Sequence, residues 1–215
     1  GTPPIFLRRT RWCRRADLRA GCPGCDVTGH RGSFESRQIP ASMIRTVPRI
    51  FLVGPMGAGK TTVGRRLAQA LRRDFVDSDQ EIEQRAGASI PLIFELEGEA
   101  SFRAREKAVI ADLTQRPDIV LATGGGTVLD PDNRRCLAGR GAVIYLCASV
   151  DEQFRRTQLD ENRPLLQTAD PRQRLTQLLE RRDPLYREVA DHIVSTEGRA
   201  LKQVVQEILR RLECD

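Results

Sequence analysis

The fold of this chain is decided by the stretch GPMGAGKT at residues 54–61, which fits the phosphate-binding loop pattern G-x-x-x-x-G-K-[ST]. An apolar run at 50–53 precedes the loop, and a run with helical character at 62–71 follows it. In such a strand–loop–helix unit, backbone N–H groups turn toward one anion, and the helix N-terminus adds partial positive charge. Lys60 would reach the β- and γ-phosphates of a nucleotide, and the Thr61 hydroxyl would coordinate Mg²⁺. A glycine-rich turn that carries lysine and threonine by chance is the alternative, and the flanking strand and helix disfavour it.

From Arg49 onward, short apolar runs alternate with helical patterns, which is typical of βαβ units on a parallel sheet. The expected strands are 50–53, 74–76, 119–122, 142–147 and 192–194. Helix starts are expected at Ser89, Asp130 and Asp170, and helix ends at Gly87 and Gly98. The apolar spacing at 204–212 predicts an amphipathic C-terminal helix packed on the sheet.

The first 42 residues differ in composition from the rest. They hold eight arginines and three acidic residues, a net charge of +5, so only +1 of the chain's +6 falls on residues 43–215. They show no apolar periodicity, and such a stretch buries too little apolar surface to offset the entropy of ordering. We therefore expect residues 1–46 to be a disordered extension rich in Arg and Cys, and residues 47–215 to form the folded domain.

Other interpretations of the extension stay open. It could be sequence upstream of a start near Met43, a basic arm for nucleic acid or an Arg-rich targeting peptide. Cys22 and Cys25, together with Cys13 and His30, have part of the spacing of a zinc site. That fit is incomplete, because no cysteine stands where a zinc knuckle would place its last ligand. Nucleic acid is not an expected partner of the folded domain.

The remaining cysteines, Cys136, Cys147 and Cys214, are far apart in the sequence, and two of them have apolar neighbours. This pattern indicates small buried side chains in a reducing compartment, so we expect a cytoplasmic protein. The chain has no apolar run of about 18 residues and no secretory hydrophobic segment, so no membrane association is expected.

Asp77 and Asp79 flank Ser78 directly after a short apolar strand. The alternation of a strand would point both carboxylates the same way, at the strand end where open α/β sheets bind ligands. One carboxylate could hold Mg²⁺, directly or through water, and the other could accept a proton from a substrate hydroxyl. A solvated acidic turn that caps a helix starting near Gln80 is the alternative. The neighbouring phosphate-binding loop favours the first interpretation.

A second strand runs into the sequence TGGG at residues 123–126. Consecutive glycines usually mean that the backbone approaches something closely. Many phosphate-loop proteins place a metal-binding aspartate at this strand end. This chain has none there, which assigns the metal role to Asp77 and leaves the glycine amides to face a substrate. A plain turn is the alternative.

Three arginines complete the candidate site. Arg163 lies in a polar stretch at 159–169, long enough for a mobile lid, and could reach over a transferring phosphoryl group. Arg103 and Arg182 offer guanidinium groups that suit a carboxylate. Taken alone, each arginine fits a surface charge, because the chain is rich in arginine.

Six motifs occur together and in order: GPMGAGKTT at 54–62, DSD at 77–79, FR at 102–103, TGGGTV at 123–128, NRPLL at 162–166 and RDPLYRE at 182–188. Over about residues 47–213 the chain resembles the shikimate kinases. The resemblance implies an α/β P-loop kinase of the nucleoside-monophosphate-kinase-like type, with a five-stranded parallel sheet between helices and a lid at about 158–170. It implies a monomer that uses ATP, with Mg²⁺ as cofactor, to phosphorylate the 3-hydroxyl of shikimate, giving shikimate 3-phosphate and ADP in aromatic amino acid (chorismate) biosynthesis.

The resemblance also implies roles for individual residues. Lys60, Asp79 and Arg163 would be catalytic, with Asp79 as the candidate base, and Thr61 and Asp77 would hold the Mg²⁺. The ATP-binding residues would be Gly57, Ala58, Gly59, Lys60, Thr61, Thr62 and Arg156, the last stacked on adenine. The shikimate-binding residues would be Asp79, Arg103, Gly124, Gly125, Gly126 and Arg182, the two arginines on its carboxylate. A proline that often lies against the other face of adenine is not evident near Arg199.

Two other functions stay open at this point. A kinase of the same fold could act on another polyol acid such as gluconate, although it would have no reason to keep the paired arginines and the glycine triplet. A catalytically idle, ligand-sensing module with a nucleic-acid-binding arm would be expected to lack Lys60 or Asp79, and both are present.

Overall fold

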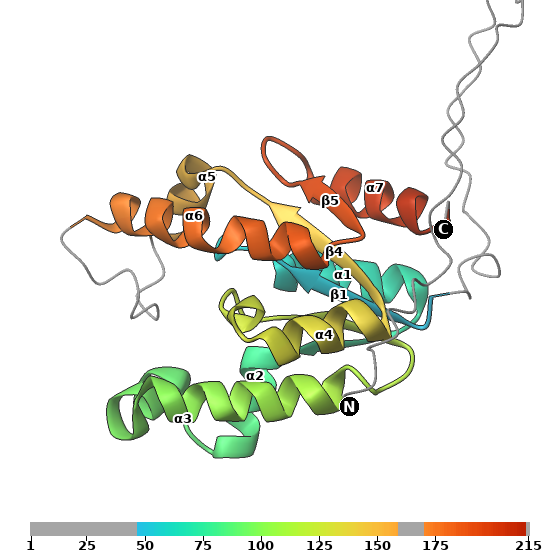
Figure 1. The fold of residues 1–215 in the computed structure, drawn as a ribbon. Coiled ribbons are helices and arrows are strands. Elements are labelled where there is room, and N and C mark those ends of the chain that lie inside the picture. Colours follow the sequence, from blue (N-terminus) through green and yellow to red (C-terminus); the bar gives the residue numbers. More distant parts are fainter. Residues whose placement is uncertain (1–46, 159–169, 214–215) are drawn as a thin grey trace, which may run out of the picture. The chain divides into compact units, whose positions relative to one another are not determined.

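Figure 1 shows the structure, a computed structural model that describes residues 47–158 and 170–213. All of these residues lie within one compact unit, Ala41–Cys214. The extension expected at 1–46, with its zinc-like cysteines, lies outside the described residues. So does Arg163, with most of the expected lid.

Strands and helices alternate along the described chain. The strands are β1 (Arg49–Val53), β2 (Asp74–Asp77), β3 (Ile119–Ala122), β4 (Ala142–Cys147) and β5 (His192–Ser195). The α-helices are α1 (Lys60–Leu71), α2 (Ser78–Ala86), α3 (Ile90–Leu113), α4 (Pro131–Arg140), α5 (Val150–Thr157), α6 (Pro171–Val189) and α7 (Leu201–Glu213). A short 3₁₀ helix, η1 (Thr127–Leu129), follows β3.

The strands form one parallel sheet in the order β2-β3-β1-β4-β5. The three central strands are almost wholly buried, because helices cover both faces of a parallel sheet. The alternation of a strand sends Ile50 and Leu52 of β1 to one face and Phe51 and Val53 to the other. The near-continuous apolar run of β1 is therefore the sequence of a strand that is buried on both sides.

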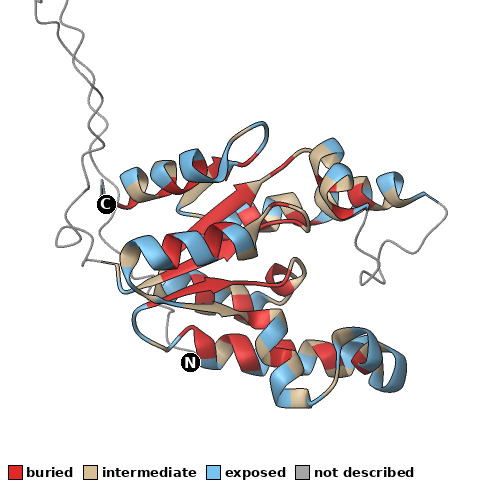
Figure 2. Cartoon of the chain, turned by 180° about the vertical axis from the view of Figure 1, so that it is seen from behind, coloured by how far each residue is buried: buried red, intermediate tan, exposed pale blue. Residues whose placement is uncertain are grey.

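Two apolar layers hold the sheet between helices, and Figure 2 shows the buried residues along the strands and the inward sides of the helices. On one face, Ile50 and Leu52 pack with α1 and α7. On the other, Phe51 and Val53 pack with α2, α3, α4 and α6. Figure 1 also shows that α7 and β5 lie toward one edge of the sheet, whereas α2 and α3 lie toward the other edge. The structure confirms the predicted fold of five parallel strands between helices.

The predicted helix starts and ends hold, except that the Ser89 side chain does not cap α3. Asp130 and Asp170 cap α4 and α6 through their carboxylates, and Gly87 ends α2 with φ 66°. Ser89 stands at the N-cap of α3, but the hydrogen bond to the first turn comes from Glu83, whose Oε1 accepts from the Ile90 amide at 2.9 Å. The amphipathic C-terminal helix is α7, which buries Val204, Val205, Ile208 and Leu212.

Gly98 interrupts the helix, as expected of a residue predicted to end one. It lies inside α3 at φ 80° and ψ 175°, where the helix kinks and then resumes. A second helical segment begins directly after this break, and packing favours it because it buries Phe102, Val109 and Ile110 in the same apolar layer.

Within the ranges that the structure describes, no helix is both long enough and apolar enough to cross a bilayer. Cys136 and Cys147 are free thiols. Both are half-buried, although the sequence suggested that they would be buried.

Candidate active site

The sheet order itself marks the place for a ligand. The chain leaves β1 toward β2 on one side, while β4 and β5 lie on the other side of β1. Open α/β sheets bind ligands at such a switch point, outside the carboxyl ends of the strands. The loop at residues 54–59 leaves β1 at this position and enters α1.

Gly54 lets the loop turn immediately after the strand. Its φ is 143°, and a Cβ at this position would lie 2.3 Å from the carbonyl oxygen of Leu146 on β4. Only glycine fits this conformation and this contact. No described side chain caps α1, whose N-cap is Gly59, and its first turn holds no acidic residue. The first amides of a helix have no intrahelical acceptors, so the loop and helix start form an anion-binding end.

Lys60 and Thr61 are the first two residues of α1, at this anion-binding end. The Lys60 ammonium donates to the carbonyl oxygens of Gly54 at 2.8 Å and Pro55 at 2.9 Å, which holds its charge at the mouth of the loop. The Thr61 hydroxyl donates to Asp77 Oδ2 at 2.8 Å. The two residues predicted to share a metal therefore lie in direct contact, and their oxygens form part of a donor set that suits a hard cation.

The geometry of Asp77 and Asp79 differs from the one predicted. Helix α2 begins at Ser78, so Asp79 lies in its first turn and strand alternation does not place it. Asp77 is the N-cap, and its Oδ1 accepts from the Asp79 amide at 3.1 Å. Asp77 therefore caps a helix, as the alternative interpretation required. Its other carboxylate oxygen, Oδ2, accepts the hydrogen bond from the Thr61 hydroxyl.

Asp79 lies in an unusual electrostatic setting. Burial raises its pKa to about 7, and the nearby carboxylates of Asp77, Glu106 and Glu83 raise it as well, while the Lys60 ammonium lowers it. A carboxyl group with such a pKa can hold or release a proton near neutral pH.

The glycine triplet lies against charged groups of three helices. A Cβ on Gly124 would lie 2.6 Å from Asp79 Oδ1, and a Cβ on Gly126 would lie 2.6 Å from Arg103 Nη1. A Cβ on Gly125 would be 3.6 Å from Arg182 Nη1 and from the P-loop atoms Gly54 O and Met56 N. The triplet therefore brings its backbone between these side chains and the loop. We call Asp79, Arg103, Arg182 and residues 124–126 the arginine–glycine cluster.

Arg182 is the most buried arginine of this cluster, 6% exposed. Its Nη1 donates to Gly125 O at 3.2 Å, and its buried Nε has no hydrogen-bond acceptor among the described residues. Burial lowers its pKa, and the charge of Arg103 acts in the same direction. A buried guanidinium with a donor to spare and a second guanidinium nearby fits an anionic ligand group.

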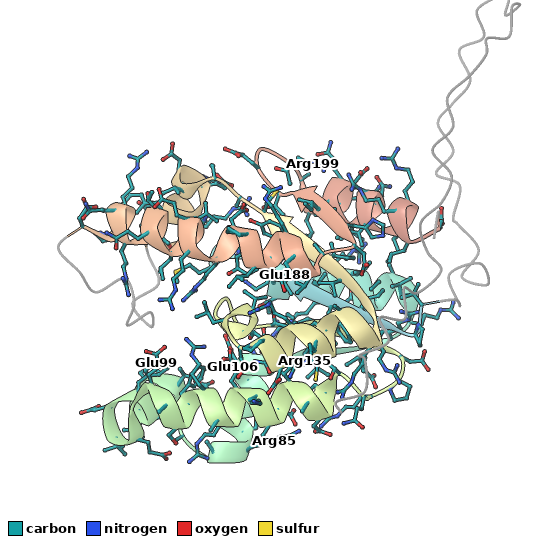
Figure 3. All side chains as sticks on the ribbon, in the orientation of Figure 1. Arg85, Glu99, Glu106, Arg135, Glu188 and Arg199 are labelled. Atoms are coloured by element: carbon teal, nitrogen blue, oxygen red, sulfur yellow. The ribbon has the colours of Figure 1, made fainter. Side chains whose placement is uncertain are left out.

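Glu106 is a site residue that the sequence analysis missed. It is 1% exposed, and its two oxygens accept from Arg103 Nη1 at 2.7 Å and from the Thr127 hydroxyl at 2.8 Å. A Cβ on Gly124 would lie 3.2 Å from Glu106 Oε1. In Figure 3, Glu106 and Glu99 lie along the same side of α3, and Glu99 also accepts from Arg103. The spacing of three residues between Arg103 and Glu106 was the available signal.

Arg156 lies in a separate part of the site. Its guanidinium donates to Gly57 O at 3.0 Å and to Thr196 O at 3.0 Å, and it pairs with Glu152 at 2.6 Å. It lines a pocket of about 230 Å³ next to the P-loop, with Ala58, Gly59, Thr62, Val63, Thr196, Arg199, Leu201 and Val204. Arg199 therefore lines the pocket in the region where the sequence shows no proline to lie against adenine.

The predicted site residues that the structure describes lie together outside the carboxyl ends of the strands. The P-loop lies between the pocket beside Arg156 and the arginine–glycine cluster. Arg163 is the one predicted site residue outside the described residues.

Comparison with known proteins finds similar sequences and structures over most of the chain. The family model of shikimate kinases matches residues 56–213. A shikimate kinase of Acinetobacter baylyi is 58% identical over 172 residues, which cover 80% of this chain and 96% of the relative. A solved structure of a shikimate kinase from Acinetobacter baumannii in complex with shikimate is 53% identical and covers 80% of this chain and 97% of that one, with a TM-score of 0.78.

A solved gluconokinase from Sinorhizobium meliloti is similar in fold alone, at 19% identity and a TM-score of 0.52, with 77% of this chain and 91% of that chain covered. The family model covers well over half of the present sequence, and the relative from Acinetobacter baylyi is matched over nearly its whole length. The chain belongs to the shikimate kinase family.

Proposed function

We propose that this chain transfers the γ-phosphoryl group of ATP to the 3-hydroxyl group of shikimate, giving shikimate 3-phosphate and ADP in aromatic amino acid biosynthesis. One observation carries the proposal. Two guanidinium groups and a carboxyl group with a raised pKa surround three glycines whose backbone lies directly beside the P-loop. An acceptor with one carboxylate and several hydroxyls fits that set, because the guanidiniums suit the carboxylate and Asp79 suits a hydroxyl.

We infer that the nucleotide is held by the P-loop and the pocket beside it. The amides of residues 57–62 and the Lys60 ammonium would bind the phosphates, and the Arg156 guanidinium would lie against the base. Arg199 lines the same pocket and is a second candidate for the base.

ATP-dependent transfer uses a divalent cation, and we propose that it is Mg²⁺ held by Thr61 and Asp77. Their oxygens are in contact at 2.8 Å, and Mg²⁺ typically takes one or two protein oxygens together with phosphate oxygens and water. When bound, the cation would neutralise charge on the β- and γ-phosphates.

We propose that Asp79 orients the reacting hydroxyl and accepts its proton. The transition state of phosphoryl transfer is loose, so alignment and charge neutralisation contribute more than strong removal of the proton. Asp79 would align the hydroxyl from the acceptor side, and Lys60 would neutralise charge from the nucleotide side. Glu106, which holds Arg103, would keep that guanidinium directed at the acceptor carboxylate.

We infer that residues 47–215 act as a monomeric kinase domain, because the P-loop, the pocket beside Arg156 and the arginine–glycine cluster adjoin one another within the same compact unit. The free thiols Cys136 and Cys147 fit a reducing compartment, in line with a cytoplasmic location.

The direct test of the function is a coupled assay of ADP release with shikimate, with gluconate and with no acceptor. We expect turnover with shikimate and only background release in the other two samples. Turnover that is faster with gluconate would identify a kinase for another polyol acid. Background release in all three would identify an idle binding module.

Replacing Arg182 with alanine should weaken shikimate binding about 30-fold, because truncating one partner of a desolvated charge pair costs at least about 2 kcal/mol. ATP binding should change by less than about threefold, since Arg182 contacts Gly125 and not the pocket beside Arg156. Separate calorimetric titrations with shikimate and with ATP measure both effects.

Arg181→Ala is the matched control, because Arg181 is the exposed neighbour of Arg182 on α6 and carries the same charge. It should bind both ligands as the wild-type protein does. Equal weakening of shikimate and ATP by Arg182→Ala would mean that Arg182 supports the fold and does not bind the acceptor.

A further inference from the structure

Tyr186 lies one helical turn after Arg182 on α6 and is fully buried. Its hydroxyl donates to the carbonyl oxygen of Gly125 at 2.5 Å, and Arg182 Nη1 donates to the same oxygen at 3.2 Å. A carbonyl oxygen has two lone pairs, so both donors can bind it at once. The middle carbonyl of the glycine triplet is therefore held by two side chains of α6.

This double contact fixes a stretch of backbone that has no side chains to restrain it. Glycine has the widest conformational freedom of all residues, so an unrestrained glycine triplet would sample many orientations of its peptide groups. The peptide bond is planar and trans, so holding the Gly125 carbonyl also sets the direction of the Gly126 amide. Gly126 is the residue next to Arg103, and Gly125 is the one next to the P-loop.

The phenol is suited to act as a permanent donor. Burial raises the pKa of Tyr186 to about 12, so the hydroxyl keeps its proton throughout the neutral range. The hydroxyl carries no charge and already donates to the Gly125 carbonyl. The two guanidinium groups therefore stay available to bind the anion.

We propose that Tyr186 is a positioning residue of the acceptor pocket, whose hydroxyl holds the Gly125 carbonyl so that the glycine backbone and the Arg182 guanidinium keep the arrangement that binds shikimate. The inference deepens the proposed function and rests on it.

Tyr145 on β4 packs against Tyr186 and therefore provides a control. The two rings lie 5.0 Å apart between centroids, and Tyr145 is also buried. Its hydroxyl donates at 2.7 Å to Asp183 Oδ1, a carboxylate that also pairs with Arg187 at 2.6 Å. Tyr145→Phe therefore removes one buried hydrogen bond beside Tyr186 without removing a donor to Gly125.

The experiment compares Tyr186→Phe and Tyr145→Phe with the wild-type protein in melting temperature, kcat, and KM for shikimate and for ATP. We expect similar losses of melting temperature, because each variant loses one buried hydrogen bond. Only Tyr186→Phe should raise KM for shikimate, by about tenfold, with KM for ATP within about twofold of wild type. An equal effect of both variants on shikimate, or an equal effect of Tyr186→Phe on both substrates, would overturn the proposal.

A wild-type protein that does not turn over shikimate would refute the proposed function. A wild-type protein that does, with a Tyr186→Phe variant that behaves like Tyr145→Phe, would refute the role of Tyr186 alone.

A spectroscopic measurement keeps the proposal testable if Tyr186→Phe does not fold. Tyr145 and Tyr186 are the only tyrosines of the chain, so Tyr145→Phe protein labelled with 3-fluorotyrosine carries a single ¹⁹F probe at position 186. Shikimate should shift that resonance at saturation, and ADP should leave it nearly unchanged. A resonance that shifts with ADP and not with shikimate would show that Tyr186 does not position the acceptor pocket.

Discussion

Replacing Lys60 with methionine should lower kcat by about 10³-fold, because the ammonium neutralises charge that develops on the phosphates in the transition state. Methionine keeps most of the length of the side chain and removes the charge. The melting temperature should fall by only a few degrees, since the lysine side chain bonds to the loop carbonyls of Gly54 and Pro55 and not to the core. Steady-state kinetics with saturating shikimate and ATP measure the first effect, and thermal unfolding measures the second.

Lys202→Met is the control for this variant, since Lys202 is an exposed lysine on α7 that does not line the pocket next to the P-loop. It should turn over as the wild-type protein does. A Lys60→Met protein with near-normal kcat would show that the loop at 54–61 does not bind the reacting phosphates.

Replacing Asp79 with asparagine should lower kcat by at least about 10²-fold and at the same time stabilise the protein above pH 7. The loss of activity follows from removing the group that orients the hydroxyl and takes its proton. The gain in stability follows from the raised pKa of about 7 against an ordinary value of 3.8. Each pKa unit corresponds to about 1.4 kcal/mol, so ionising Asp79 in the folded protein costs on the order of 4 kcal/mol.

The pH dependence of unfolding tests the sign of this effect. A carboxyl group with a raised pKa binds a proton more tightly in the folded than in the unfolded state, so its contribution is fully present below about pH 4. That contribution is lost as the pH rises to about 7. The free energy of unfolding of Asp79→Asn relative to wild type should therefore grow between pH 4 and 7 and level off above pH 7. A difference that stays constant over this range would show that Asp79 titrates normally.

The P-loop could be predicted from sequence because its physical requirements are local. The glycines, Lys60 and Thr61 must follow a buried strand and open a helix, and the apolar run of β1 and the pattern of α1 are visible in the residues alone. Asp130 and Asp170 were predictable as caps for the same reason, since a cap depends on residues only two or three positions away.

Contacts that depend on packing could not be predicted in this way. Glu106 looks like a surface charge in its own segment, and only the approach of α3 to the glycine triplet buries it beside Arg103 and Thr127. Tyr186 is 61 residues from Gly125, so no local pattern indicates their hydrogen bond. Gly98 breaks α3 as predicted, but the sequence did not indicate that a second helical segment would follow at once and pack on the same apolar layer. Strand alternation was the wrong basis for placing Asp79, because α2 begins at Ser78 and Asp77 caps that helix.

The most direct test of the central claim is a ³¹P NMR spectrum of the products formed from ATP and shikimate by this chain. We expect the γ-phosphate signal of ATP to be replaced by one phosphomonoester signal, coupled to the proton on C3 of shikimate. A phosphomonoester on another hydroxyl would contradict the proposed orientation of the acceptor by Asp79 and the arginines. Conversion of the γ-phosphate only to inorganic phosphate would contradict the transfer itself.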